Sequence, residues 1–435
     1  MDTLGNQVRR LTSSSAIACG LLAIVATVLF QTPLLAQTFV SGSTGADGPF
    51  NPTVNVTLDL PPSGIFNFTT VNIPSNVVVT FNRNAANTPV TILATGDVSI
   101  AGIIDVSGGD AVAGVPGRAG PGAFDGGMGG TGFGSSPNGT PGLGPGGGQG
   151  GVAGAGQFPG SASGGGFGTQ GTANGAAVPG GQTYGVHTLF PLIGGSGGGG
   201  GAGGPTSSGP AGGGGGGAIL IASSGTITMN VQFVSRGIFA QGGNGAVKAV
   251  GLPQNVASGC GSGGAIRLIA NSIVTNGALL DVRSGCSAGL IGGGLGRVRL
   301  ETFQQSGGFG PGGITTSSQG LPGKVLPDSA SPSVRIVSIG GVNVPPTPQA
   351  TYFNVPDVTV DPNLANPITV ALEAHNVPLG TALAVSVVTE GVATRTTFNS
   401  TPLTGTLASS TATANVTLPP GTSVLTATAT FAGAP

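Results

Sequence analysis

Short runs of apolar and β-branched residues, separated by Gly, Asn and Pro, fill the chain from Thr53 to Val106. Clear examples are residues 77–81, 90–94 and 97–100. Runs of about four to eight such residues, with turn-forming residues between them, predict β-strands. No stretch after residue 36 repeats its apolar residues with the spacing of a helix. The pattern therefore predicts an all-β fold.

A unit of strand, tight turn, strand, glycine turn and strand occurs repeatedly along the chain. The copies are residues 90–108, 218–240 and 265–285, with a partial further copy at 296–300. One such unit cannot bury its apolar face alone, but stacked units share a continuous core. We therefore predict a parallel β-helix in which Ile92, Ile221 and Leu268 form one inward-facing column. A β-sandwich of hairpins is the alternative, but most strand junctions lack turns such as Asn-Gly.

A glycine-rich insertion, residues 109–217, separates the first two copies and contains unbroken glycine runs at 197–201 and 212–217. Glycine does not keep a period of three, so a collagen helix is excluded. Three interpretations remain: a flexible linker, a loop with little order, or polyproline-II-like glycine strands packed side by side. Its phenylalanines are anchors to the repeats or are spaced by chance; they are Phe124, Phe133, Phe158 and Phe167.

The composition changes near residue 333, where Thr, Val and Ala replace Gly. We interpret 304–332 as a linker and 333–435 as a separate domain. Its strand candidates are 334–339, 358–360, 368–374, 383–388, 394–398, 411–418 and 424–431. Short strands of this number predict an immunoglobulin-like β-sandwich, although the Cys and Trp landmarks of that fold are absent.

The first 36 residues have the pattern of a secretory signal peptide. Arg9 and Arg10 precede an apolar run at 16–30, and the small residue Ala36 is a plausible cleavage point. A membrane anchor is the alternative, but the run is short for a full span. We expect export with cleavage, and no membrane span in the mature chain. The predicted organisation is signal peptide 1–36, β-helix coils 37–108, insertion 109–217, further coils 218–303, linker 304–332 and sandwich 333–435.

Charged residues make up only 6% of the chain, and the net charge is −1. Nucleic-acid binding requires clustered Lys and Arg, and no such cluster occurs, so we expect no nucleic-acid partner. Few charges also leave little to oppose self-association. Glycine-rich phosphate-binding motifs need a following helix, which the sequence does not predict. We therefore expect no cofactor.

Cys260 and Cys286 are the cysteines that remain after signal removal, and they lie about one predicted coil apart. Exported cysteine pairs are often oxidised. The alternative is two separate small residues among glycines. No histidine lies near them in the sequence, which argues against a zinc site. We predict a Cys260–Cys286 disulfide.

Asp105 and Asp281 hold similar places in their repeats, and Arg267, Arg283, Arg297 and Arg299 lie in later coils. Glycoside hydrolysis needs two carboxyl groups about 5–10 Å apart, so this aspartate pair is a weak catalytic candidate. The intervening copy has Ala240 at the matching place, and no aromatic platform is expected. Each aspartate fits better as a residue that ends a strand by bonding the turn backbone. His187 and His375 lie in different regions and have no metal-ligand spacing.

The glycine-turn strand repeat with its poly-glycine runs, from Thr53 to Leu300, resembles secreted bacterial glycine-rich parallel β-helix proteins and the solenoid passengers of surface adhesins. This resemblance implies an adhesive or matrix role and brings no catalytic residues with it. We therefore expect a secreted or cell-surface structural or adhesive protein without catalysis, in contact with polysaccharide or cell-surface material. The alternatives are a carbohydrate-binding protein and a polysaccharide-degrading β-helix enzyme.

Overall fold

The computed structural model describes residues 37–112, 114–131, 138–153, 160–204, 207–230, 236–249, 255–286, 291–310 and 317–431. The expected signal peptide, residues 1–36, lies outside the described residues. Within the described ranges the chain forms strands and turns and no helix. The fold is all-β, as the alternation of apolar runs and turn residues predicts.

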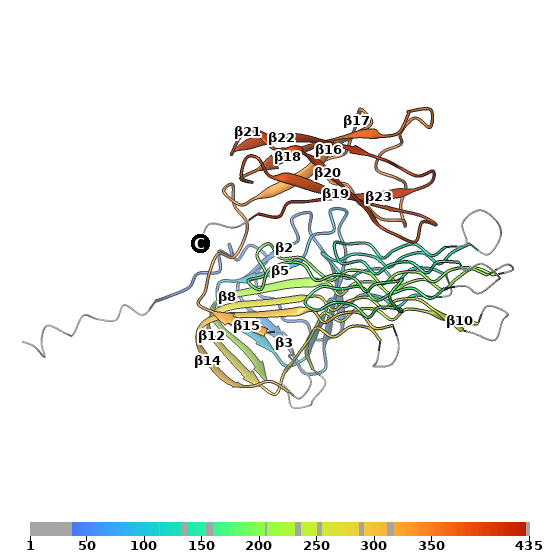
Figure 1. Ribbon diagram of the computed structural model, residues 1–435. Coiled ribbons are helices and arrows are strands. Elements are labelled where there is room, and N and C mark those ends of the chain that lie inside the picture. The colour runs from blue at the N-terminus through green and yellow to red at the C-terminus, as the bar shows by residue number, and fades with distance from the viewer. Residues whose placement is uncertain are drawn as a thin grey trace, which may run out of the picture. The chain divides into compact units, whose positions relative to one another are not determined.

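Two sheets with parallel pairing, which we name A and B, contain the repeated units (Figure 1). Sheet A consists of β2 (Ile65–Phe68), β3 (Val71–Ile73), β5 (Val90–Ala94), β6 (Val98–Ile100), β8 (Ala218–Asn230), β12 (Ala265–Asn276), β14 (Arg297–Gly308) and β15 (Ser317–Gly320). Sheet B consists of β1 (Val56–Asp59), β4 (Val78–Asn82), β7 (Ile103–Asp105), β9 (Gly237–Phe239) and β13 (Leu279–Asp281). From β1 to β9 the chain passes back and forth between the sheets, with one or two successive strands in sheet A between strands of sheet B, and β12, β13 and β14 continue this order.

The repeated units pair in register within sheet A. Ile92 pairs with Ile221, Ile221 with Leu268, and Leu268 with Leu300. All four side chains are at most 1% exposed and belong to one hydrophobic cluster. The predicted column is therefore present, and Leu300 of the partial copy extends it.

The tight turn expected inside the second and third units is absent. Each of those units begins with one long strand, β8 or β12, and the register between them shifts between Ala270 and Ser272. A β-bulge of this kind absorbs extra residues without ending the ladder. The first unit keeps the break, because β5 and β6 are separate strands that both pair with β8.

Glycine-rich segments lie side by side and bond to one another through their backbones (Figure 1). Gly127 N donates to Gly198 O at 2.9 Å, Gly198 N to Gly213 O at 2.9 Å, and Gly213 N to Gly259 O at 3.0 Å. Gly259 belongs to a glycine run outside the insertion, so the layer joins the insertion to the repeats. A Cβ atom on Gly198 would overlap the carbonyl oxygen of Gly259. Glycine is therefore required at this close approach.

The described residues of 109–217 are thus an ordered layer, and the interpretations as a flexible linker or a loop with little order were wrong. Glycine-rich chains are flexible when nothing binds their backbone. Here the buried N–H and C=O groups find partners in neighbouring segments. Phe167 is fully buried in a small apolar cluster and Phe124 is half-buried. Phe133 and Phe158 lie outside the described residues.

Two antiparallel sheets, which we name C and D, follow in the C-terminal region. Sheet C consists of β16 (Ser333–Ile339), β17 (Val342–Asn343), β18 (Ile368–His375), β21 (Thr404–Thr406) and β22 (Ser409–Val416). Sheet D consists of β19 (Ala382–Thr389), β20 (Thr396–Pro402) and β23 (Ser423–Thr428). Alternate residues of both sheets, including Leu372 and Val385, form one hydrophobic core.

Two shorter segments differ from the sequence expectation. Residues 358–360 form no strand, and they are flanked by Pro356 and Pro362, each of which lacks the backbone N–H that a ladder uses. A small antiparallel pair, β10 (Val247–Ala249) and β11 (Asn255–Ala257), was not predicted.

Part of 304–332, interpreted as a linker, is attached to sheet A. β15 pairs with β14, and Gly323 N and Lys324 O then bond Glu301 and Arg267, which are both buried. The linker interpretation was wrong for 317–325 because buried charged groups on the sheet require partners there. We call residues 317–325 the strap.

From Val40 onward the chain forms one compact unit. Arg395 of the C-terminal region donates from its guanidinium to Pro145 O and Gly142 O, both at 3.0 Å. Leu143, Val388 and Val424 form an apolar cluster beside it. The C-terminal sheets are therefore bonded directly to the glycine layer.

Candidate functional site

The outer face of sheet B carries both predicted site aspartates. The strand register forms one ladder across this sheet, which runs Thr57, Thr80, Asp105, Phe239 and Asp281. The adjacent residues Ile104 and Ile238 are fully buried in the core. Because side chains alternate between the two faces of a strand, the ladder residues point outward. The structure thus places Asp105 and Asp281 on one ladder, with a single strand, β9, between them.

The residue between the two aspartates is Phe239, which corrects the expectation of Ala240. Phe239 is half-buried, whereas Ala240 is fully buried in the common core. The expected alignment was displaced by one residue, and a displacement of one moves a side chain to the opposite face. An aromatic ring therefore does lie between the carboxylates.

Asp281 is buried, and its carboxylate is fully used by neighbouring groups. Arg283 donates from Nε to Oδ1 at 2.9 Å, and Gln241 Nε2 donates to Oδ2 at 2.5 Å. Burial alone would raise the pKa of the Asp281 carboxyl, but the hydrogen bonds from Arg283 and Gln241 and the charge of Arg283 outweigh it and lower the pKa. The fold therefore favours the ionised form of Asp281, because Arg283 and Gln241 bond its carboxylate.

Asp105 and Asp281 both bond the turn that follows them. Ser107 N donates to Asp105 Oδ1 at 2.9 Å, and Arg283 N donates to Asp281 Oδ1 at 3.1 Å. These bonds match the interpretation that each aspartate ends a strand by bonding the turn backbone. Asp105 differs from Asp281 because it also lines a concave surface.

That surface is a depression of 390 Å³ on the outer face of sheet B. Polar and charged side chains form most of its lining: Thr80, Asn82, Arg83, Asp105, Ser107 and Arg118. Ala119 to Pro121 close one side. Its lining contains one carboxylate, that of Asp105, whereas glycoside hydrolysis uses a pair of carboxyl groups.

Three of the four arginines in the later coils lie on sheet A, away from the aspartates. Arg267 and Arg299 bond Glu301, with Arg267 Nη2 at 3.0 Å from Oε2 and Arg299 Nε at 3.2 Å from Oε1. Arg297 donates to Tyr184 O at 3.1 Å and lies over the ring of Phe167. One indication of this network is visible in the sequence, where charged residues alternate with Val298 and Leu300, which are buried.

The cysteines and histidines considered in the sequence are bonded to, or lie close to, other residues of the fold. Cys260 and Cys286 form a disulfide, with their Cα atoms 5.8 Å apart. His375 lies 3.3 Å from Glu373 on an exposed part of sheet C. The backbone carbonyl of His187 accepts a hydrogen bond from Ser318 Oγ at 2.7 Å.

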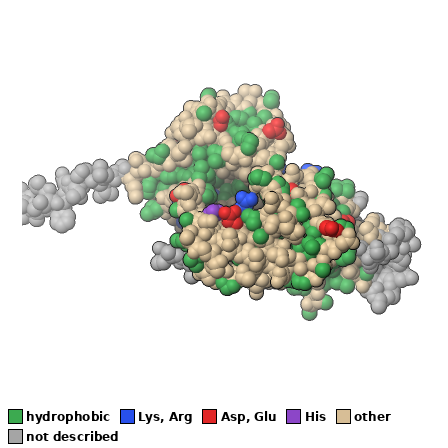
Figure 2. All heavy atoms as spheres, turned by 90° about the horizontal axis from the view of Figure 1, so that it is seen from above, with side chains coloured by type: hydrophobic (Ala, Val, Ile, Leu, Met, Phe, Trp, Pro, Cys, Tyr) green, Lys and Arg blue, Asp and Glu red, His purple; other side chains and the backbone are tan. Residues whose placement is uncertain are grey.

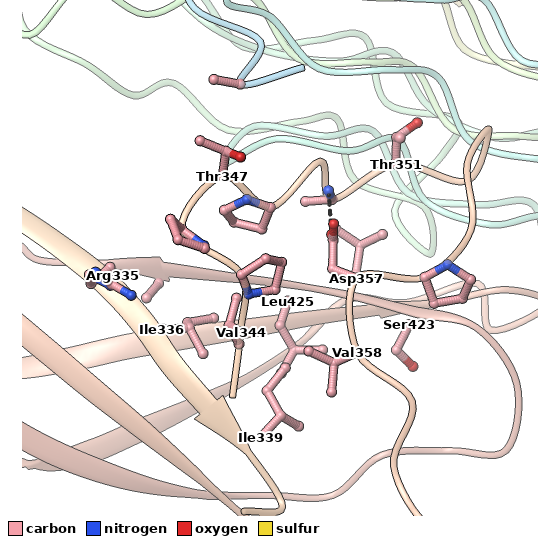
Figure 3. A pocket seen from close by; sticks show the side chains of 18 of the residues that line it. Arg335, Ile336, Ile339, Val344, Thr347, Thr351, Asp357, Val358, Ser423 and Leu425 are labelled. Atoms are coloured by element: carbon pink, nitrogen blue, oxygen red, sulfur yellow. Dashed lines mark hydrogen bonds between the residues drawn. The ribbon is translucent and has the colours of Figure 1, made fainter. Parts of the chain in front are cut away.

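A second concavity, of 480 Å³, lies in the C-terminal region (Figure 3). Apolar side chains such as Ile336, Val344 and Leu425 dominate its lining. Asp357 is its acidic residue, and its carboxylate accepts from Gln349 N and Ala350 N at 3.0 Å each. That carboxylate therefore orders the turn at Gln349 and Ala350.

Within the described ranges, no group of three or more His, Cys, Asp or Glu could hold a metal ion. The described part of the chain also has no helix long and apolar enough to cross a membrane. No family model, no curated protein and no solved structure matches this chain.

Proposed function

We propose that this chain is a secreted or cell-surface structural or adhesive protein without catalysis. In this proposal sheets A and B are the faces of a parallel β-helix, the glycine layer extends its coils, and sheets C and D form an immunoglobulin-like module. The in-register column through Ile92 and Leu268, with parallel pairing throughout both sheets, supports the β-helix.

The observation that carries the proposal is the use of charged side chains to join segments distant in the sequence. Asp125 is the best example, because its carboxylate bonds Arg83 at 2.6 Å, Ala119 N at 2.7 Å and Thr351 Oγ1 at 2.7 Å. One buried carboxylate thus links a repeat, the glycine layer and the C-terminal region. A buried carboxylate whose hydrogen bonds all go to other parts of the chain favours the interpretation as a rigid scaffold over a reactive site.

The surface agrees with an adhesive role in an extracellular setting. Figure 2 shows charged side chains as a few separate spots on a face that is otherwise apolar or uncharged. A surface with so few charges adsorbs readily and does little to resist self-association.

Adsorption and turnover measurements test the proposal together. The purified full chain is passed over polysaccharide-coated and uncoated sensor surfaces, and the same preparation is incubated with a panel of plant and bacterial polysaccharides. We expect retention on at least one surface and no new reducing ends. Release of reducing ends that Asp105→Ala or Asp281→Ala abolishes would show an enzyme. Failure to adhere to any surface would also contradict the proposal.

A further inference from the structure

The floor of the depression on sheet B presents four hydrogen-bonding side chains in a fixed array. Thr80 pairs with Asp105 across β4 and β7. Asn82 is the next outward residue of β4, and Ser107 follows the end of β7 by two residues. Neighbouring strands lie about 4.8 Å apart and outward residues about 6.7 Å apart along a strand. The four groups therefore form a small rectangular grid.

Hydrogen bonds to neighbouring residues orient these side chains and leave some of their acceptor oxygens without a partner. Asn82 Nδ2 donates to Asp59 Oδ1 at 2.7 Å, which leaves the amide oxygen of Asn82. Asp105 Oδ1 accepts from Ser107 N, and Oδ2 of Asp105 has no hydrogen bond to any part of the chain that the structure describes. Fixed acceptors of this kind suit the hydroxyl groups of a ligand.

Two guanidinium groups form the wall. Arg83 is 22% exposed and is paired with Asp125, so its charge is largely compensated. Arg118 is exposed, and its guanidinium lies 4.4 Å from the ring centroid of Phe353. Among the described residues no carboxylate pairs with Arg118. Arg118 is therefore a positioned cation with its donors available.

We propose that this depression binds an acidic saccharide, a uronate unit of a polysaccharide. Its hydroxyl groups bond Asp105 and Asn82, and its carboxylate pairs with Arg118 in the fork geometry that guanidinium favours. Repulsion from Asp105 directs the carboxylate of the ligand toward the arginine wall. The volume of the depression is in the usual range for small ligands, about 300–1,000 Å³. This inference rests on the adhesive role proposed above and names its ligand.

Phe239 indicates that the ligand is a chain of sugars and not a single unit. It follows Asp105 on the ladder, one strand further on, and its ring is half-buried. A second sugar ring bound one strand along meets this aromatic face. Stacking on the ring buries apolar area of the sugar without requiring further charged groups.

Calorimetric titration of the full chain with hexagalacturonate and with neutral cellohexaose tests the inference. We expect binding of the acidic oligomer that weakens with added salt, and at least about tenfold weaker binding of the neutral one. Arg118→Ala and Asp105→Asn should each weaken acidic-oligomer binding by about tenfold or more. Arg335→Ala removes an exposed arginine on β16 and is the matched control, with affinity unchanged.

Three results would overturn the inference: no binding of the acidic oligomer, equal affinity for both oligomers, or unchanged affinity in both variants. The adsorption assay on the same proteins separates this failure from failure of the proposed function. A chain that adheres to surfaces but does not bind the oligomer keeps the adhesive role and loses this ligand. A chain that does not adhere at all fails the proposed function.

Discussion

Arg267 and Glu301 form a two-point ion pair across neighbouring strands of sheet A, with Nε 3.1 Å from Oε1 and Nη2 3.0 Å from Oε2. The two residues are 3% and 2% exposed. Arg267 also donates to Lys324 O at 2.8 Å, and Glu301 accepts from Gly323 N at 3.0 Å. The pair thus bonds the strap, 317–325, which leads to the C-terminal sheets.

Glu301→Gln should release the strap. The substitution leaves the Arg267 guanidinium buried without an anion, and breaking a buried pair in this way costs about 3–5 kcal/mol. We expect lower stability to denaturant and trypsin cleavage after Lys324 at least about tenfold faster. Cleavage is followed by mass spectrometry of the two fragments.

Asp328→Asn is the matched control for that experiment. Asp328 pairs with Lys324, but both side chains are about half exposed. Exposed pairs contribute little, so the cleavage rate should remain within about twofold of the original. Equal cleavage rates in Glu301→Gln and the original chain would show that the ion pair does not hold the strap.

Gly198→Ala should disrupt the glycine layer. The added Cβ would meet the backbone of Gly259, which cannot move without breaking its own bonds. Overpacking of this kind costs about 1–3 kcal/mol. Gly308→Ala, where the added Cβ meets nothing within 4 Å, should change the free energy of unfolding by less than about 0.5 kcal/mol. Similar thermal stabilities for the two variants would argue against a packed layer.

Stability should fall in acid partly through Asp281. The folded state lowers the pKa of this carboxyl, so it favours the ionised form. Its contribution is complete above the ordinary aspartate pKa of about 3.9 and is lost as the pH falls through the lower folded value. Denaturant unfolding between neutral pH and acid should show a smaller loss in Asp281→Asn. Asp361 is exposed, so Asp361→Asn is the control and should leave the pH profile of stability unchanged. If the profile of Asp281→Asn were identical to that of the original chain, the assignment to Asp281 would be contradicted.

Reduction of the Cys260–Cys286 disulfide should destabilise the chain. The bond joins residues 26 apart in the sequence. In the chain-entropy model, closing a loop of this length is worth about 3–4 kcal/mol. The Cys260→Ala, Cys286→Ala double variant should unfold like the reduced chain and should not respond to reductant. If reductant also lowered the stability of the double variant, the effect of reductant could not be assigned to the Cys260–Cys286 disulfide.

The sequence alone determined the all-β class, the repeated units and the inward column. These follow from the alternation of apolar and polar residues, which is local and has the period of a strand. Most strands of sheets C and D follow from the same pattern. The alignment of the second unit erred by one residue: β9 begins at Gly237, whose φ is +139°, and Phe239, not Ala240, holds the outward position.

Only the tertiary structure decided the glycine layer, the depression and the strap. Glycine has no side chain to indicate its partner, so the pairing of Gly198 with Gly213 and of Gly213 with Gly259 depends on backbone groups that are alike in every segment. Arg267 and Glu301 alternate with core residues and therefore look like surface positions. They are buried because a segment distant in the sequence covers them, and a local pattern contains no information about that cover.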